Sequence, residues 1–188
     1  MANGQVVTKV KTGEVRLSYA HIFEPHGIDG NEPKYSVSLI IPKSDTVTLN
    51  SIKRAIEEAK KQGVGKFGGK IPAVLKLPLR DGDEERPEDE AYKNSYFINA
   101  SAKTKPGVLN ELGQPATPDE VYSGCYARVS VNFYAFNSNG NKGIACGLNN
   151  LMKTRDGDNL GGRIAAEDDF ADEIAGVADS TDYSGMLD

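Results

Sequence analysis

The chain has 188 residues, of which 38% are hydrophobic and 26% charged, and its formal net charge is −5. It contains no run of 18 apolar residues, which excludes a helical membrane span, and its first residues lack the charged start and apolar block of a secretion signal. We therefore expect a cytoplasmic protein with one domain and appendages.

The first half of the chain predicts two strands followed by a helix. Apolar and polar residues alternate over 15–23 and over 35–41, which is typical of strands. In the first strand the alternation places one set of side chains on the same face: Val15, Leu17, Tyr19, His21 and Phe23. Over residues 46–62 apolar residues recur at steps of three and four, which predicts a helix that ends before Gly63.

The second half predicts three more strands, and these are expected over residues 96–103, 126–136 and 143–151. Asn139-Gly140 between the last two strands is a strong hairpin signal. Five short strands with one early helix and with Gly- and Pro-rich loops indicate a small barrel or a sandwich. Periodicity alone does not choose between the two.

Two long loops separate these elements, over residues 63–95 and 104–124. The first contains an acidic stretch, residues 81–90, with seven acids and one base. Such a stretch can steer a charged ligand or bind a partner, but we expect it mainly to be solvated.

No motif in the chain indicates catalysis, so we expect that the protein is not an enzyme. GxSxG, HExxH and GxxxxGK[ST] are absent. Cys125 and Cys146 lack CxxC spacing and do not form a zinc site with the two histidines, so we expect reduced thiols. Asp-Gly-Asp segments at Asp81 and Asp156 lack the ligand spacing of a calcium loop. We therefore expect no metal and no cofactor.

A binding role fits the residues better, because single-stranded nucleic acids are held by a basic groove and by flat side chains on which bases stack. The candidates for stacking are Tyr96, Phe97, Tyr134 and Phe136, although the alternation can also place Tyr96 inside. The candidates for binding phosphate are Arg16, Lys76, Arg80, Lys103, Lys105, Arg128, Lys142 and Lys153. The alternative for each ring is that a helix or loop covers it as part of a second core layer.

Charge separates a basic body from an acidic tail. Residues 1–166 hold 22 Lys and Arg against 19 Asp and Glu, a net of +3, whereas residues 167–188 hold eight acids and no base. Such a tail can imitate a polyanion, compete for a basic groove on its own body, or dock a partner. It can also simply keep the protein soluble. The asymmetry points to nucleic acid.

A series of short motifs runs in order along nearly the whole chain. The first half carries Gly13-Glu14-Val15-Arg16, Pro33-Lys34-Tyr35-Ser36-Val37 and Pro78-Leu79-Arg80-Asp81-Gly82. The second half carries Lys105-Pro106-Gly107-Val108, Tyr122-Ser123-Gly124-Cys125-Tyr126-Ala127-Arg128-Val129, Gly140-Asn141-Lys142-Gly143, Asp156-Gly157-Asp158-Asn159-Leu160-Gly161-Gly162-Arg163 and Asp168-Asp169-Phe170. With these motifs the chain resembles a family of bacteriophage single-stranded-DNA-binding proteins.

The resemblance implies a mainly β fold, an OB-fold five-stranded barrel with one helix, long loops and a disordered acidic C-terminal tail. It divides the chain into a domain that binds single-stranded nucleic acid, residues 1–163, and a flexible acidic tail, residues 164–188. The implied protein coats and protects single-stranded DNA, without sequence preference, in phage DNA replication, recombination or repair.

The same resemblance implies that the tail recruits replication or recombination proteins and competes with DNA. The tail residues that would do so are Asp168, Asp169, Phe170, Asp172, Asp182, Leu187 and Asp188. One departure is that the chain ends on Met186-Leu187-Asp188, whereas many such tails end on an aromatic residue.

Two other functions remain open from the sequence. One is an interaction scaffold of the replication machinery with little DNA affinity of its own, and the other is an RNA-binding OB module. A homo-oligomer is also left open, and the expected compartment is the host cell cytoplasm.

Overall fold

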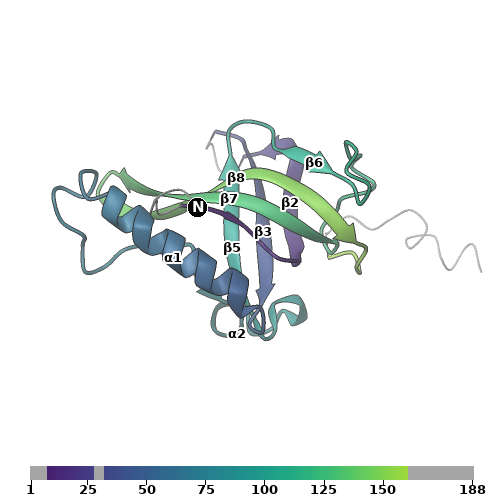
Figure 1. Cartoon of the computed structure of the whole chain (residues 1–188), viewed down its shortest axis with the longest axis horizontal. Coiled ribbons are helices and arrows are strands. Elements are labelled where there is room, and N and C mark those ends of the chain that lie inside the picture. The colour runs from purple at the N-terminus through teal and green to yellow at the C-terminus, as the bar shows by residue number, and fades with distance from the viewer. Residues whose placement is uncertain (1–7, 28–31, 161–188) are drawn as a thin grey trace, which may run out of the picture.

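The structure is a computed structural model that describes residues 8–27 and 32–160 (Figure 1). Its strands are β1 (Lys9–Lys11), β2 (Val15–His26), β3 (Lys34–Pro42), β4 (Leu79–Asp81), β5 (Ser95–Ala102), β6 (Gly107–Leu109), β7 (Tyr126–Ser138) and β8 (Asn141–Arg155). Its helices are α1 (Thr46–Gln62), the short α2 (Gly82–Glu85) and the 3-10 turn η1 (Glu90–Tyr92).

Five of these strands close into a ring. β7 pairs with β2, β2 with β3, β3 with β5, β5 with β8, and β8 again with β7. Only the β5–β8 pairing in this ring is parallel. The closed pairing distinguishes a barrel from a sandwich and confirms the predicted OB-type fold. β1, β4 and β6 extend the sheet beyond the ring.

The barrel core lies between the inner faces of the strands and helix α1. On β7, Ala127, Val129, Val131, Phe133 and Ala135 are all buried, as their alternation predicts. The buried side of α1 packs in the same cluster, and Figure 1 shows the helix beside the long β7–β8 hairpin. Helix and strands therefore share one hydrophobic core.

Helix α1 begins and ends where the sequence predicts. The side chain of Asp45 accepts a hydrogen bond from the Thr48 backbone N–H (3.1 Å), which caps the first turn. Gly63 follows the last turn, and a Cβ atom there would collide with the Cβ of Ala135. Glycine is therefore needed at this position for the close approach of α1 to β7.

The predicted face of β2 is correct only for the first part of the strand. Val15 and Leu17 are buried, but the pairing of β2 with β3 shifts register between Ser18 and His21. Tyr19 in this bulge has a φ of 48° and is 57% exposed. The extra residue reverses the side-chain parity, so Ile22 faces the core in place of its neighbours.

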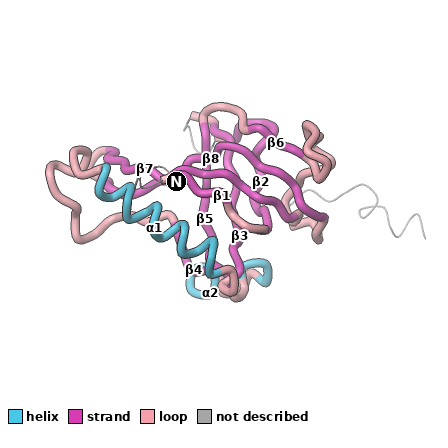
Figure 2. Tube along the Cα trace, in the orientation of Figure 1, coloured by secondary structure: helices cyan, strands magenta, loops and turns pink. Residues whose placement is uncertain are grey.

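The acidic stretch 81–90 is folded and not an irregular loop, although five of its seven acids are exposed to solvent, as expected. It forms α2 and leads into η1, and the side chains of Asp81 and Asp89 cap these two turns. Tyr92 at its end packs with Ile40 and Phe97 in a second hydrophobic cluster on the outside of the barrel. Figure 2 shows α2 beside β4 and the end of β3.

Within residues 8–27 and 32–160, no helix is long and apolar enough to cross a membrane. Cys125 and Cys146 are both free and buried, and burial raises the pKa of each thiol. The tail beyond residue 163, with all its predicted partner-binding residues, lies outside the described part of the chain.

Candidate nucleic-acid interface

The outer wall of β2, β3 and β5 is the first candidate surface, because OB barrels bind oligonucleotides on the face of their second and third strands. In this ring those strands are β3 and β5. Their outward side chains lie opposite one another as Ser36 with Ser101, Ser38 with Asn99, and Ile40 with Phe97. We call this surface the β2–β3–β5 wall.

Tyr92 covers the part of the β2–β3–β5 wall that holds Ile40 and Phe97. This corrects the prediction that Phe97 is an exposed stacking ring. Phe97 is only 2% exposed and packs edge-on against Tyr92, with ring centroids 5.1 Å apart. The Tyr92 hydroxyl donates a hydrogen bond to Ser38 Oγ at 3.1 Å. The alternative that a loop covers the ring in a second core layer is therefore the correct one for Phe97.

The open part of this wall carries residues that the sequence did not single out. Tyr19 projects from the bulge in β2, and the guanidinium of Arg86 lies 5.8 Å from its ring centroid. His21 and His26 stack with ring centroids 4.2 Å apart. Burial, and the charge of His26, lower the pKa of His21. A simple alternation places Tyr19 on the buried face, because it does not reveal the bulge. The sequence does carry a signal for Arg86, which is the only base among seven acids in residues 81–90.

Several predicted cations lie at the margins of the β2–β3–β5 wall. Arg80 on β4 pairs with Glu85 at 2.7 Å, and the exposed Lys103 lies 3.6 Å from Glu32. Lys105 is exposed just beyond β5. Arg16 donates hydrogen bonds to the carbonyl oxygens of Gly124 (3.0 Å) and Asp158 (2.9 Å). Arg16 thus keeps its charge while its position is fixed.

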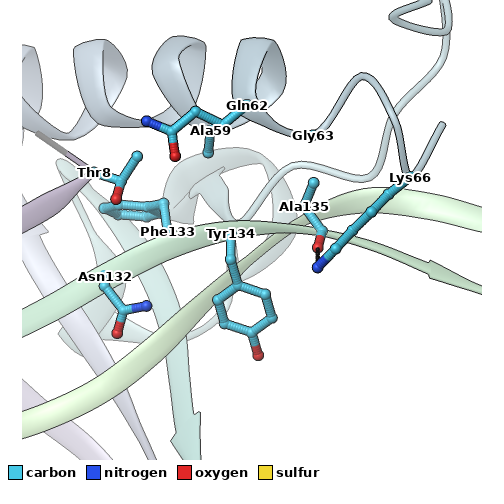
Figure 3. A pocket seen from close by; sticks show the side chains of 9 residues that line it. All are labelled: Thr8, Ala59, Gln62, Gly63, Lys66, Asn132, Phe133, Tyr134 and Ala135. Atoms are coloured by element: carbon cyan, nitrogen blue, oxygen red, sulfur yellow. Dashed lines mark hydrogen bonds between the residues drawn. The ribbon is translucent and has the colours of Figure 1, made fainter. Parts of the chain in front are cut away.

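The loop 63–78 lies beside the tip of the β7–β8 hairpin (Figure 1), and both segments carry lysines. The Lys76 N–H donates to the Lys142 carbonyl (3.1 Å), and the Lys76 carbonyl accepts from Ile144 N–H (2.8 Å). Lys66 donates to the Ala135 carbonyl (3.1 Å), as Figure 3 shows. We call residues 63–78 with 137–142 the basic arm, because they hold Lys66, Lys70, Lys76 and Lys142 and no acid.

The outer face of β7 and β8 brings together three other predicted residues. Arg128 and Tyr134 are exposed, and Phe136 is half-buried opposite Gly143. Figure 3 shows Phe133 pointing toward α1 and the Tyr134 ring on the opposite side of the strand. We call this surface the β7–β8 wall. Arg128, Tyr134 and Phe136 share one face of β7, and the strand leads from them to the basic arm that carries Lys142 and Lys76.

Lys153 does not belong to either surface, which corrects the prediction that it binds phosphate. Its side chain is 5% exposed and its ammonium lies 2.6 Å from Asp156 and 3.8 Å from Glu111. Burial lowers the pKa of Lys153, but the bond to Asp156 and the two negative charges outweigh it, so the pKa is raised. A buried and neutralised ammonium has no free charge to offer a phosphate.

Tyr96 faces the core side of the barrel, the alternative placement that its position allowed. It is half-buried against the main hydrophobic cluster. The ammonium groups of Lys43 and Lys53 lie 5.2 Å and 5.9 Å from its ring centroid. Its ring therefore lies away from the outer wall on which Asn99 and Ser101 are found.

Three acids of the 81–90 stretch form ion pairs within the protein, and Glu85 is one of them through Arg80. Lys43 lies 3.0 Å from Asp81 and 2.8 Å from Asp83. The hydrogen bond from Lys43, followed by that from the Asn94 backbone N–H, lowers the pKa of Asp83. The hydrogen bonds to Asp83 and Asp81 raise the pKa of Lys43. In the part of the chain that the structure describes, no group of His, Cys, Asp and Glu is arranged to hold a metal ion.

Comparisons with known proteins agree with this architecture. The family model of the ssDNA-binding protein of Enterobacter phage Enc34 matches residues 8–182. "Putative protein p50" of Acyrthosiphon pisum secondary endosymbiont phage 1 is 34% identical over 178 residues, with 87% of this chain and 93% of that protein covered.

Solved structures are similar as well. The single-stranded DNA-binding protein from bacteriophage Enc34 in complex with ssDNA has a TM-score of 0.75 at 30% identity, over 82% of this chain and 90% of that one. The single-stranded DNA-binding protein encoded by bacteriophage T7 has a TM-score of 0.57 at 18% identity, over 89% of this chain and 94% of that one, and this likeness concerns the fold alone. The chain belongs to the family of phage single-stranded-DNA-binding proteins that the Enc34 protein represents.

Proposed function

We propose that this protein binds single-stranded DNA without sequence preference and coats it during phage DNA replication, recombination or repair. The observation that carries the proposal is the family match over residues 8–182, together with the likeness to an Enc34 protein solved in complex with ssDNA. The family's role is binding rather than catalysis, and we extend this to propose that the chain has no enzymatic activity.

The exposed cations and rings give this proposal its physical basis. Phosphates would be neutralised by Arg16, Lys76, Arg80, Lys103, Lys105, Arg128 and Lys142, and bases would stack on Tyr134 and Phe136. The β7–β8 wall and the basic arm support this assignment because residues 121–155 and 59–80 contain no acid. Within these two segments a polyanion meets only neutral or positive side chains, and Glu14 beside the end of β8 is paired with Arg155.

The proposal also divides the chain by function. Residues 1–163 would bind DNA, and the acidic residues 164–188 would recruit replication or recombination proteins and compete with DNA. The last described residues support the competition, because they lie against the DNA-binding body: Arg16 donates to the Asp158 carbonyl, and Leu160 packs on the Tyr92–Phe97 cluster. Leu160, the last described residue before the tail, therefore lies next to the β2–β3–β5 wall.

A titration with a fluorescently labelled oligo-dT, followed by anisotropy over a series of salt concentrations, tests the proposal. Affinity should fall steeply with salt, because each neutralised phosphate releases counterions. Oligo-rU and a duplex of the same length are the matched controls, and preference for rU would indicate an RNA-binding module. Absence of binding to dT, or a flat salt response, would refute the proposal, and the former would favour a scaffold.

Removal of residues 167–188 tests the tail separately. The deletion takes away eight negative charges that compete with phosphate, so dT affinity should rise, most strongly at low salt where charges are least screened. A chain in which those eight acids are replaced by Asn and Gln keeps the length and is the matched control. Unchanged or weaker binding would limit the tail to solubility or partner docking.

A further inference from the structure

Arg86 occupies an unusual position on the β2–β3–β5 wall. Its guanidinium carbon lies 5.2 Å, 5.4 Å and 5.8 Å from the ring centroids of Phe97, Tyr92 and Tyr19. Its Nε atom is buried and has no hydrogen-bond partner. A buried polar group without a partner is rare in folded proteins and calls for an explanation.

The described acids near Arg86 form no ion pair with its guanidinium. Although seven acids lie in residues 81–90, the described ion pairs of that stretch join Asp81 and Asp83 to Lys43, and Glu85 to Arg80. Among the described residues, no carboxylate lies within ion-pair distance of Arg86. The acidic stretch thus holds one cation on the barrel wall without neutralising it through direct contact.

Tyr19 is the exposed member of this cluster and is also strained. A φ of 48° lies in the left-handed region, which a bulky residue adopts only at a cost. Such outliers persist where the surrounding structure enforces them, and they cluster at functional sites. The residue is 57% exposed, although a buried position would have been more favourable for so large a side chain.

The wall around Tyr19 is polar. Along it, the residues next to the bulge are Ser18, paired with Ser38, and His21, paired with Ser36. Ser18 and Ser38 are buried, and Ser38 accepts the hydrogen bond of Tyr92. His21 and Ser36 are half-buried and Asn99 on β5 is exposed, so these three are the polar side chains that a ligand beside Tyr19 could reach.

We propose that Tyr19 and Arg86 form a nucleotide subsite, in which a base stacks on the exposed face of Tyr19 and the adjacent phosphate binds the guanidinium of Arg86. This inference rests on the proposed single-strand binding and locates one contact of it. A planar guanidinium both stacks on rings and binds phosphate oxygens through its fork of donors. One ring and one cation at this spacing therefore match the two chemical parts of a nucleotide.

A tryptophan at position 19 provides a direct probe, because the natural chain contains no tryptophan. In full-length Tyr19→Trp, fluorescence should be quenched as oligo-dT binds, since a base would stack on the indole. Leu112→Trp is the matched control, because Leu112 is 80% exposed in the loop between β6 and β7. Anisotropy of a labelled oligo-dT, recorded for both variants, reports binding independently of the quenching.

Two further substitutions separate binding from folding. Tyr19→Asn removes the ring and places a residue that tolerates the left-handed region, so the melting temperature should not fall. Its dT affinity should drop about 5- to 150-fold, the range for one stacked base. Arg86→Gln is compared with Arg54→Gln on the exposed side of α1, because each removes one positive charge, and only the former should weaken binding strongly.

The outcomes distinguish this inference from the function on which it rests. Quenching at position 19 but not at 112, with weaker binding by Tyr19→Asn, supports the subsite. If the labelled dT binds Tyr19→Trp without quenching, and Tyr19→Asn binds like the wild type, the subsite is refuted and single-strand binding stands. Equal quenching at both positions also refutes it. If the wild type does not bind dT at all, the proposed function itself fails.

Discussion

Replacing Phe97 by alanine should destabilise the fold by about 3 kcal/mol, because its ring is a core element rather than a DNA contact. Removing a buried Phe side chain costs about 3–5 kcal/mol, depending on how well the site collapses. Phe97 is buried in a small cluster beneath one surface segment, with Tyr92 and Ile40 as its fully buried partners. That segment can settle into the space, which favours the lower end of the range.

For a chain of this length, the loss corresponds to a fall in melting temperature of about 6–12 °C. Thermal unfolding followed by circular dichroism measures it, and oligo-dT affinity is recorded at 25 °C on the same samples. Phe97→Leu should cost less than about 1.5 kcal/mol because it keeps most of the volume. Tyr134→Ala, which removes an exposed ring from β7, should cost less than about 1 kcal/mol. A Phe97→Ala protein with wild-type stability but lost DNA affinity would refute the burial argument.

Three other effects can be tested by unfolding experiments. Asp156→Asn should lower the free energy of unfolding by about 1–3 kcal/mol more than Lys153→Met does, because only Asp156→Asn leaves a buried ammonium without its partner. Equal losses in urea titrations would contradict this. Gly82→Ala should cost about 1–3 kcal/mol and speed proteolysis near residue 86, since its Cβ would crowd two backbone carbonyl oxygens, one of them at 2.8 Å. Burial and a neighbouring histidine hold the pKa of His21 below its usual value, so the stability it contributes is present above about pH 6.5 and declines as pH falls. His21→Gln should flatten that decline, and an unchanged pH profile would refute the assignment.

The elements that sequence predicted well are those whose pattern extends over several turns or pleats. α1 and β7 each present one buried face over more than ten residues, so their periods are unambiguous. β1, β4 and β6 span three residues each, which is too short to show any period. They form because β7, β5 and β8 have free edges in the assembled sheet, and the local sequence does not show where such edges lie.

The errors in the site have a common origin in tertiary contacts. The alternation correctly placed Phe97 on the outside of the barrel, but it could not show that Tyr92 covers it. Lys153 has the same parity as the buried Leu151, and only its charge suggested a surface position; in the structure it pairs with Glu111 and Asp156. In β2 a single inserted residue reversed the parity after Ser18 and exposed Tyr19. None of these contacts leaves a signal in the local sequence.

The distribution of charge explains how a chain with a net charge of −5 can present a surface for a polyanion. Charges separated by more than about 8–10 Å are largely screened at physiological salt, so the local sign matters more than the total. The acids of residues 81–90 gather around α2, where Lys43 and Arg80 already pair with three of them. Residues 59–80 hold six Lys and Arg and no acid. Under the proposed function, the acid-free segments would attract the DNA strand along the basic arm and the β7–β8 wall. The proposed subsite at Tyr19 and Arg86 lies on the other wall beside the acidic stretch, so its phosphate contact would depend on the Arg86 guanidinium itself and not on the surrounding charge.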